Sequence, residues 1–228
     1  MVNSLLGFQD LYASFDAPCT ELDCGQLCAA HNPGGKPFCC DICHAVPVAY
    51  QSEWTQLRKH TNLWHQWQGD ECLEEPVARD ELESQTPGHL TLLACKGPQY
   101  CEREYRTVSC RQFPFFPYIT DDFRFIGLGY DWDFTPVCWV LSNLNQVTRA
   151  YRQQFVQAFD RIFSIWLEDM DSYAQLSEEM REHFAAIHRR FPLMHRNGAD
   201  YLVSPRSGKL QRCDLGSLPK FGFYRDQK

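Results

Sequence analysis

Apolar residues in the last third of the chain recur at three- and four-residue steps. This spacing is that of one face of a helix. It predicts an amphipathic helical region from Ser142 onward, and its stripe comprises Tyr151, Phe155, Ala158, Phe159, Ile162 and Trp166. A second helix is predicted over residues 177–191, ended by Pro192 because proline lacks the backbone N–H that a helix needs. We expect the stripe to face the core rather than a cofactor or partner.

Shorter patterns precede this helical part. Residues 49–67 carry a rough apolar face of tryptophan and leucine, with Ser52 as a candidate N-cap, and this predicts a helix. Residues 89–95 and 123–130 are short, apolar and rich in β-favouring side chains, which predicts strands. Residues 74–89 are acidic and contain two prolines, so they are the nearest thing to a linker.

Together these elements predict an α+β fold that is mainly helical, with an irregular, cysteine-rich, metal-binding front portion packed on C-terminal helices. Residues 1–140 form the predicted cysteine-cluster metal-binding region. Residues 141–228 form the predicted helical region, which ends in a short strand or hairpin flanked by the turns that Asn197-Gly198 and Ser207-Gly208 indicate. We expect both regions in one compact domain, because 228 residues suit a single core.

The composition is that of a folded protein, with 44% hydrophobic and 14% aromatic residues. A net charge of −7 provides no basic field, so we expect no binding to nucleic acid. No apolar run approaches the roughly 18 residues that a membrane span needs. The first residues also lack the basic and apolar segments of a secretory signal. We therefore expect a cytoplasmic protein that is not inserted in a membrane.

Motifs of the common enzyme classes are not evident. Gly127 and Gly129 follow a predicted strand without completing a glycine-rich phosphate loop, so a turn or bulge is favoured. Asp131 and Asp133 are interpreted as a solvated turn rather than a magnesium site. The sequence contains neither G-x-S-x-G nor H-E-x-x-H. Catalytic residues therefore stay unassigned, and whether the protein is an enzyme stays open.

Twelve cysteines are many for a chain without a recognisable export signal. In a reducing compartment, clustered cysteines bind metal or carry redox chemistry more often than they form disulfides. A disulfide-stapled protein is the main competing interpretation. The first group is Cys19, Cys24, Cys28, Cys39, Cys40 and Cys43, the second is Cys95, Cys101, Cys110 and Cys138, and Cys72 and Cys213 are taken as spare or buried thiols.

The first group is able to supply one structural zinc site. Its candidate ligands are Cys24, Cys28, Cys40 and Cys43, with His44 or His31 as substitutes, since zinc binds thiolate and imidazole. The side chains of Cys39 and Cys40 are adjacent in sequence and should point in different directions. We therefore expect them not to bind one mononuclear ion together, although they could reach different atoms of a larger cluster.

The second group offers four thiolates in Cys95, Cys101, Cys110 and Cys138. Four thiolates suffice for zinc or for a 4Fe–4S cluster, and the spacing alone does not choose between them. Arg103, Arg106 and Arg111 lie within or beside this group. They are candidate cofactor-binding residues, because guanidinium groups can offset the thiolate charge and donate hydrogen bonds to sulfur. The alternative is that they pair with surface carboxylates.

The order of these cysteines resembles the YkgJ-type cysteine-cluster proteins, whose more elaborate relative is flagellin lysine N-methylase. Cys39-Cys40 is followed by Cys95, by Cys101 with Arg103 and Arg106, by "CRQFP" at 110–114, and by Cys138. The resemblance covers roughly residues 19–140. A ten-residue stretch separates Cys28 from Cys39, Cys43 is an extra cysteine, and Trp139 replaces a frequent proline.

This resemblance implies a 4Fe–4S cluster, and more weakly redox or protein-modification chemistry related to methylation, with a protein or peptide as substrate. The alternative is a non-catalytic structural zinc protein that binds a partner through its helical region. In either case, the predicted metal ligands are drawn from Cys24, Cys28, Cys39, Cys40, Cys43, Cys95, Cys101, Cys110 and Cys138. Phe113, Phe115, Phe116 and Tyr118 are expected to form an apolar wall, which ordinary core packing explains equally well.

Overall fold

The computed structural model describes residues 7–72 and 79–226 and divides the chain into two compact units. Unit 1 comprises residues 1–22 and 114–228, and unit 2 comprises residues 23–113. The predicted division at 140/141 therefore differs from the observed one. The difference arises because the hairpin of residues 115–130 pairs with a strand from the C-terminal part of the chain.

Unit 1 is an α+β unit built on one antiparallel sheet of order β4-β5-β6-β7-β8. Its strands are β4 (Phe115–Ile119), β5 (Phe125–Tyr130), β6 (Phe191–His195), β7 (Asp200–Val203) and β8 (Leu210–Arg212). Its helices are α1 (Phe8–Ser14), α6 (Arg149–Phe163) and α7 (Leu167–Ala186). The strand predicted at 123–130 and the short strand between the two glycine turns are thus confirmed, as β5 and β7.

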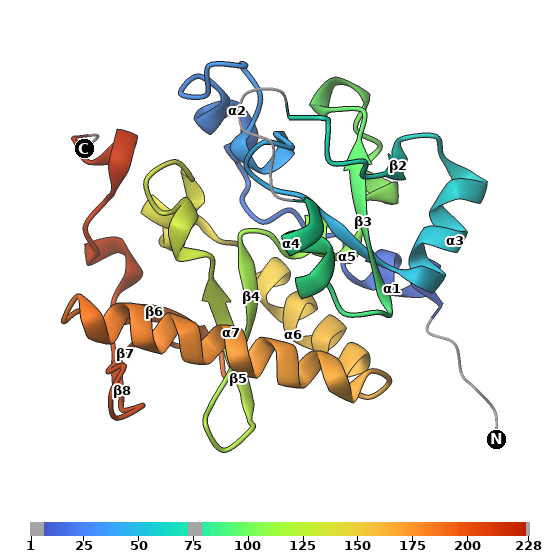
Figure 1. Ribbon diagram of the computed structural model, residues 1–228. Helices are drawn as coiled ribbons and strands as arrows, with labels where there is room; N and C mark the ends of the chain where they lie inside the picture. The colour runs from blue at the N-terminus through green and yellow to red at the C-terminus, as the bar shows by residue number, and fades with distance from the viewer. Residues whose placement is uncertain (1–6, 73–78, 227–228) are drawn as a thin grey trace. The chain divides into compact units, whose positions relative to one another are not determined.

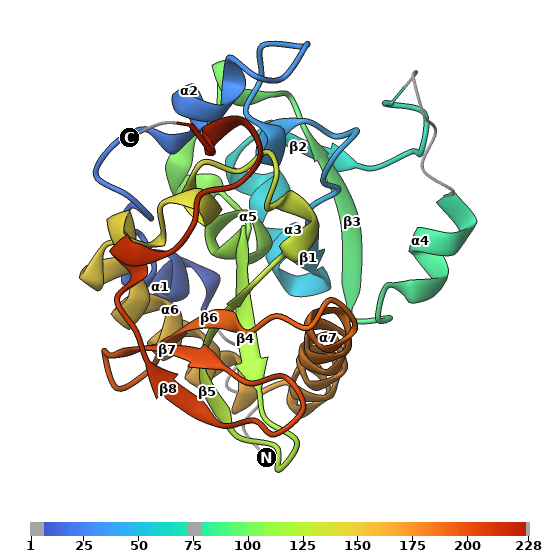
Figure 2. The same ribbon diagram turned by 90° about the vertical axis from the view of Figure 1, so that its left-hand side faces the viewer.

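Helices α6 and α7 cover opposite faces of the β4–β5 hairpin, as both views show (Figures 1 and 2). Phe115 contacts Tyr151 of α6, whereas Tyr118, three residues along β4, lies against Arg181 of α7. Side chains alternate between the faces of a strand, so residues three apart point to opposite sides. Every residue of β4 and β5 is buried as a result.

The apolar stripe predicted after Ser142 is confirmed as the buried face of α6, and it packs in the core of unit 1. The helix begins only at Arg149, because Thr148 acts as the N-cap and accepts a hydrogen bond from the N–H of Tyr151 (3.1 Å). Residues 140–142 and 144–146 form short 3₁₀ turns instead. Trp166 lies beyond the helix and stacks on Phe8 of α1.

The second helix was predicted to run to Pro192, and this end is wrong: α7 ends at Ala186. His188 adopts a left-handed φ of 53°, and the N–H of Arg189 donates to the Phe184 carbonyl (2.9 Å). This is the Schellman geometry that terminates helices. Pro192 then lies inside β6, opposite Leu202 of β7.

Gly127 marks a close approach between β5 and β6. Its φ is +158°, and an added Cβ would lie 2.3 Å from the carbonyl oxygen of Met194. The pairing of β4 with β5 also shifts register beside it, between Tyr118 and Ile119. The interpretation of this glycine as part of a turn or bulge is therefore confirmed.

Unit 2 contains a three-stranded antiparallel sheet with β3 in the centre. Its strands are β1 (Val48–Tyr50), β2 (Trp64–Gln66) and β3 (Leu90–Cys95), and β3 confirms the strand predicted at 89–95. Its helices are α2 (Cys24–Ala29), α3 (Gln51–His60), α4 (Arg79–Gln85) and α5 (Val108–Gln112). Of the predicted linker at 74–89, residues 74–78 lie outside the described residues, and most of the remainder is α4.

The helix predicted over residues 49–67 is confirmed only as far as His60. Trp64–Gln66 form strand β2 instead, because they pair with the end of β3. The N-cap is Tyr50 rather than Ser52, and its N–H donates to the carboxylate of Glu53 (3.1 Å). Long-range pairing thus overrides the local helical pattern.

No helix within the described residues is long and apolar enough to cross a membrane.

Candidate metal centre

Four thiols from separate segments of unit 2 interact electrostatically, and we name them the thiol cluster. Cys40 ends the 3₁₀ turn η1 (Phe38–Cys40), Cys95 ends β3, Cys101 follows the 3₁₀ turn η2 (Pro98–Tyr100), and Cys110 lies in α5. Burial raises the pKa of Cys110 most, and the charges of Cys40, Cys101 and Cys95 raise it further. Burial is also the main reason that the pKa of Cys95 is raised, and the charges of Cys40 and Cys101 add to it. The fold therefore brings together one cysteine of the first group and three of the second.

Helix α5 is fixed by a buried carboxylate and a cap. Glu53 is fully buried and accepts hydrogen bonds from the N–H of Val108 (2.8 Å) and from the N–H of Tyr50, so one side chain ties the starts of α5 and α3 together. Thr107 caps α5 by accepting from the N–H of Cys110 (3.1 Å). These bonds place the Cys110 thiol relative to the sheet.

A second anchor joins α5 to strand β1. The Ser109 hydroxyl donates to the Val48 carbonyl (2.6 Å) and accepts from the Val48 N–H (3.2 Å). The segment before the helix is held to β2, since the Trp64 indole N–H donates to the Tyr105 carbonyl (2.8 Å). The cysteines and arginines of residues 101–111 are thus displayed on a segment bonded to both edges of the sheet.

Arg106 is the cation of the thiol cluster. Its Nε donates to the Cys101 sulfur (3.2 Å). Burial alone would lower the pKa of Arg106, but the neighbouring Cys110, Cys101 and Cys40 outweigh burial and raise it. Arg106 therefore donates to sulfur, whereas its predicted role in binding a cofactor stays a prediction.

The two other predicted arginines have different contacts. Arg111 donates to the carbonyl oxygens of Arg106 (2.9 Å), Arg103 (3.2 Å) and Glu104 (2.8 Å), so it braces the loop that carries Arg106. Arg103 is exposed and lies 3.9 Å from Asp23. Arg111 therefore supports the site through the backbone, and the Arg103 contact matches the surface alternative.

The first cysteine group approaches the thiol cluster through Cys40. Charges on Cys24 and Cys40 both raise the pKa of Cys28, after burial, which raises it most. The sulfurs of Cys39 and Cys40 lie 3.9 Å apart. The expectation that these neighbouring side chains diverge is wrong, because the tight 3₁₀ turn brings both sulfurs to one side.

The pKa values of Cys40 and Cys110 in the thiol cluster differ widely. The pKa of Cys40 is lowered to about 7, first by its hydrogen bond with Cys39 and, against the effect of burial, by the charge of Arg106. Burial is the main reason that the pKa of Cys110 is raised to about 12, although Arg106 opposes it. Backbone N–H groups of Phe38 and Gly97 act on Cys28 and Cys95 in the direction that favours thiolate. Such N–H donors to sulfur are a recurrent feature of metal–thiolate sites.

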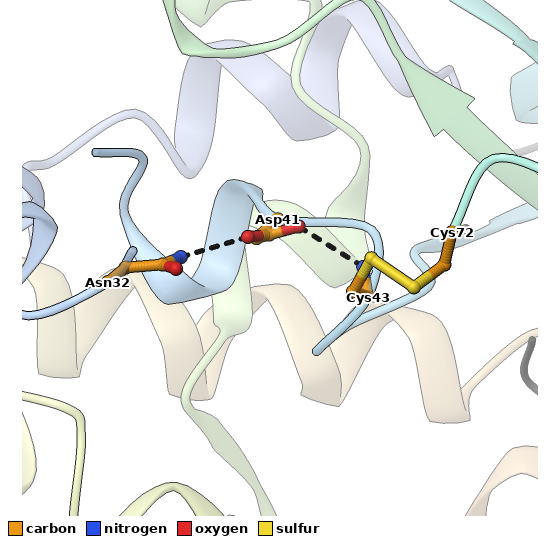
Figure 3. Close-up of a disulfide and its surroundings, with 4 residues drawn as sticks. All are labelled: Asn32, Asp41, Cys43 and Cys72. Carbon is orange, nitrogen blue, oxygen red and sulfur yellow. Dashed lines mark hydrogen bonds between the residues drawn. A yellow bond between two sulfur atoms is a disulfide. The ribbon is translucent and has the colours of Figure 1, made fainter. Parts of the chain in front are cut away.

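The ten-residue stretch between Cys28 and Cys39 is closed by polar contacts. Asn32 and Asp41 are both buried, and the Asn32 amide donates to one Asp41 oxygen (2.9 Å). The other Asp41 oxygen accepts from the N–H of Cys43 (3.2 Å), as Figure 3 shows. These bonds tie the stretch to the residues that follow Cys40.

Cys43 and Cys72 form a disulfide across 29 positions (Figure 3). The prediction of Cys43 as a metal ligand is therefore wrong for this structure, because a disulfide sulfur has no thiolate to donate. The interpretation of Cys72 as a spare thiol is wrong as well. The other ten cysteines are not in disulfides, so the chain is not a fully stapled scaffold.

The other predicted ligands and the predicted apolar wall lie in several parts of the structure. Cys138 belongs to unit 1, so its role as the fourth ligand of the second group stays a prediction, as do those of Cys24, Cys28 and Cys39. His44 is exposed and meets the Phe38 ring edge-on (5.0 Å), whereas His31 is partly buried in the loop. Phe115, Phe116 and Tyr118 are buried in strand β4 of unit 1, where core packing explains them.

Within residues 7–72 and 79–226, no three His, Cys, Asp or Glu side chains converge in a ready ligand geometry. The thiols are nevertheless coupled in one network with a cation and N–H donors. Cysteine sulfur is the ligand that zinc and iron–sulfur clusters share.

Comparison with known proteins does not identify a family or a fold relative for this chain. No protein-family profile matches the chain, and neither the curated proteins nor the solved structures contain a significant match.

Proposed function

We propose that the thiol cluster of unit 2 binds an iron–sulfur cluster of the 4Fe–4S type and that the protein carries out redox or protein-modification chemistry. The observation that carries the proposal is the hydrogen bond from Arg106 to the Cys101 sulfur (3.2 Å), beside a buried Cys110 on which the charges of Cys40, Cys95 and Cys101 act. Four thiolates are the usual complement of such a cluster. The choice of iron over zinc, and of a protein or peptide substrate, rests on the resemblance to YkgJ-type proteins.

The cysteines and the arginines would have different roles in binding the metal. The four sulfurs would be the ligands, and each must lose its proton to bind. A bound metal supplies the positive charge that makes this loss favourable even for Cys110, whose pKa is about 12. Arg106 would offset part of the negative charge and donate to sulfur, and Arg111 would hold the Arg106 loop in place.

Zinc is the second candidate, since a Cys₄ set also forms structural zinc sites. In that case the metal would stabilise unit 2 without catalysis, and a partner would bind through the helical region. The two proposals differ in a property that is simple to measure, because zinc thiolate sites are colourless and iron–sulfur clusters are brown.

The test is anaerobic purification followed by a visible spectrum, with iron, acid-labile sulfide and zinc quantified in the same sample. Matched iron and sulfide with visible absorbance support the proposal. Stoichiometric zinc in a colourless sample overturns it in favour of the structural site. A sample that holds neither metal after anaerobic iron and sulfide reconstitution overturns both.

Matched variants locate the site. Cys110→Ala should abolish the chromophore, whereas Cys213→Ala, which removes a thiol of unit 1, should leave it intact. Arg106→Lys should keep the iron but shift the reduction potential, because lysine retains the charge and loses the planar donor to Cys101. Equal iron in wild type and Cys110→Ala would place the metal elsewhere.

A further inference from the structure

Unit 1 contains a cavity that the proposed metal centre does not use. Its volume is about 240 Å³, and all of its lining residues belong to unit 1. The walls include Tyr130, Trp132, Phe184, Leu202 and Phe221. An apolar cavity of about 150 Å³ is enough to hold a benzene ring. This one therefore has room for a ring with a short substituent.

The charged side chains that line the cavity are positive. Arg189 and Arg190 line it, and none of the described acidic residues does. Neither arginine forms an ion pair within the part of the chain that the structure describes. Burial raises the pKa of Tyr130, another residue of the cavity wall, and the charge of Arg189 opposes that rise. An apolar cavity with two uncompensated cations complements an apolar anion.

The fold holds these arginines in place. The left-handed His188 ends α7, so the chain turns at once and delivers Arg189 and Arg190 to the cavity. The Arg189 guanidinium lies over the Phe221 ring, 5.3 Å from its centroid, which orients its plane. Arg190 donates to the side chain of Gln211. Both cations are therefore positioned by neutral groups, and their charge is available to a ligand.

Two hydrogen bonds hold Phe221 of the cavity wall against Ser142. The Ser142 hydroxyl accepts from the Phe221 N–H (2.9 Å) and donates to its carbonyl (3.3 Å). Gly222 follows with a φ of +52°, and an added Cβ would lie on top of the Pro136 carbonyl. The C-terminal segment is thus fitted closely against residues 135–144. On the other side, the Trp132 indole stacks on His183 (5.5 Å), which makes a rigid aromatic face.

We propose that this cavity binds a small aromatic carboxylate, with its ring between Trp132 and Phe184 and its carboxylate at Arg189 and Arg190. Arginine is the side chain suited to a planar carboxylate, because its N–H groups bind both oxygens at once. The apolar walls supply affinity for the ring, and the two cations select the acid over its neutral analogue. This site is independent of the thiol cluster, so either proposal can fail alone.

The test is titration of the full-length protein with phenylacetate and with the matched neutral compound phenylacetamide, followed by calorimetry and saturation-transfer NMR. We expect phenylacetate to bind about tenfold or more tightly than the amide, because charge-assisted hydrogen bonds are lost with the amide. Arg189→Gln/Arg190→Gln should remove that preference. Arg206→Gln, which changes an exposed arginine of the same unit that does not line the cavity, should preserve it.

A second variant guards against a folding defect in the double mutant. Ile187 is an exposed residue of the cavity rim, so Ile187→Glu should fold normally and weaken phenylacetate binding by placing a negative charge beside the arginines. Equal affinity for acid and amide would overturn the proposal. So would an acid preference that survives in both variants, or the absence of binding by either compound at millimolar concentration.

Discussion

Unit 1 holds eleven of the twelve largest fully buried side chains in the described part of the protein, and unit 2 holds the twelfth, Leu93. Unit 2 instead holds nine of the twelve cysteines and the disulfide. The aromatic core of unit 1 runs through Phe155, Phe159 and Phe163, whose rings contact one another in sequence along α6. Burial of apolar area is thus the dominant stabilising term in unit 1.

Unit 2 compensates for its smaller core with polar and covalent ties. One of its apolar clusters contains Trp67, Leu92 and Ala94. The buried Glu53 and Thr107 satisfy backbone N–H groups at helix starts, and a disulfide closes a long loop. Small domains with limited cores commonly depend on disulfides or metals. If unit 2 binds a metal as proposed, removal of the metal should lower the stability of unit 2 and leave that of unit 1 unchanged.

The largest expected loss of folding stability comes from a core substitution in unit 1. Phe159→Ala should lower the free energy of unfolding by about 3–5 kcal/mol, because a fully buried ring is removed from a close-packed core. Urea unfolding gives the magnitude, and hydrogen exchange of peptides from each unit gives the location. The control is Leu167→Ala, which changes a side chain that is 70% exposed and should cost less than about 0.5 kcal/mol. Equal loss of protection in both units would contradict independent cores.

Removal of the disulfide should have the next largest effect, and on unit 2. Cys43→Ser/Cys72→Ser should lower its stability by about 2–4 kcal/mol, because the cross-link restricts a loop of 29 positions in the unfolded chain. Amide protection in residues 23–113 should fall while that of residues 114–228 is unchanged. Reductant should reproduce the effect in the wild type and do nothing to the variant. A reductant effect that persists in the variant would contradict the assignment.

The smallest effect is a shift in thiol reactivity. Cys40 has a pKa of about 7, so its alkylation in metal-free protein should be half-maximal near that pH, whereas the pKa of Cys213 in unit 1 is raised by burial and it should react only at higher pH. Cys39→Ala removes the main cause of the lowering and should move the Cys40 midpoint upward. Mass spectrometry of alkylated peptides measures both. An unchanged midpoint would assign the lowering to Arg106 instead.

The lowered pKa of Cys40 determines how this residue changes the stability of the fold with pH. The pKa of Cys40 is lower in the folded protein than its ordinary value of 9.0. Its thiolate therefore stabilises the fold fully above pH 9, and the contribution is lost as the pH falls through about 7.

Local periodicity in the sequence was enough to predict several elements. The stripe of α6 and the strands β3 and β5 were predicted, since each depends on residues within one helix or strand. The cysteine density favoured metal or redox chemistry over disulfides, and this stays a prediction, whereas Cys43 and Cys72 form a disulfide. Arg103, Arg106 and Arg111 were predicted together as candidate donors to sulfur, and the structure shows such a bond from Arg106 to Cys101.

Contacts between distant segments decided the rest. Trp64–Gln66 became a strand because the end of β3 offered it partners, and Pro192 lies in a strand because His188 had already ended α7. The sequence grouped Cys40 with its neighbours, but the fold placed it with Cys95, Cys101 and Cys110 and paired Cys43 with Cys72. Sequence spacing limits what one segment can bind, but only the folded chain determines which segments meet.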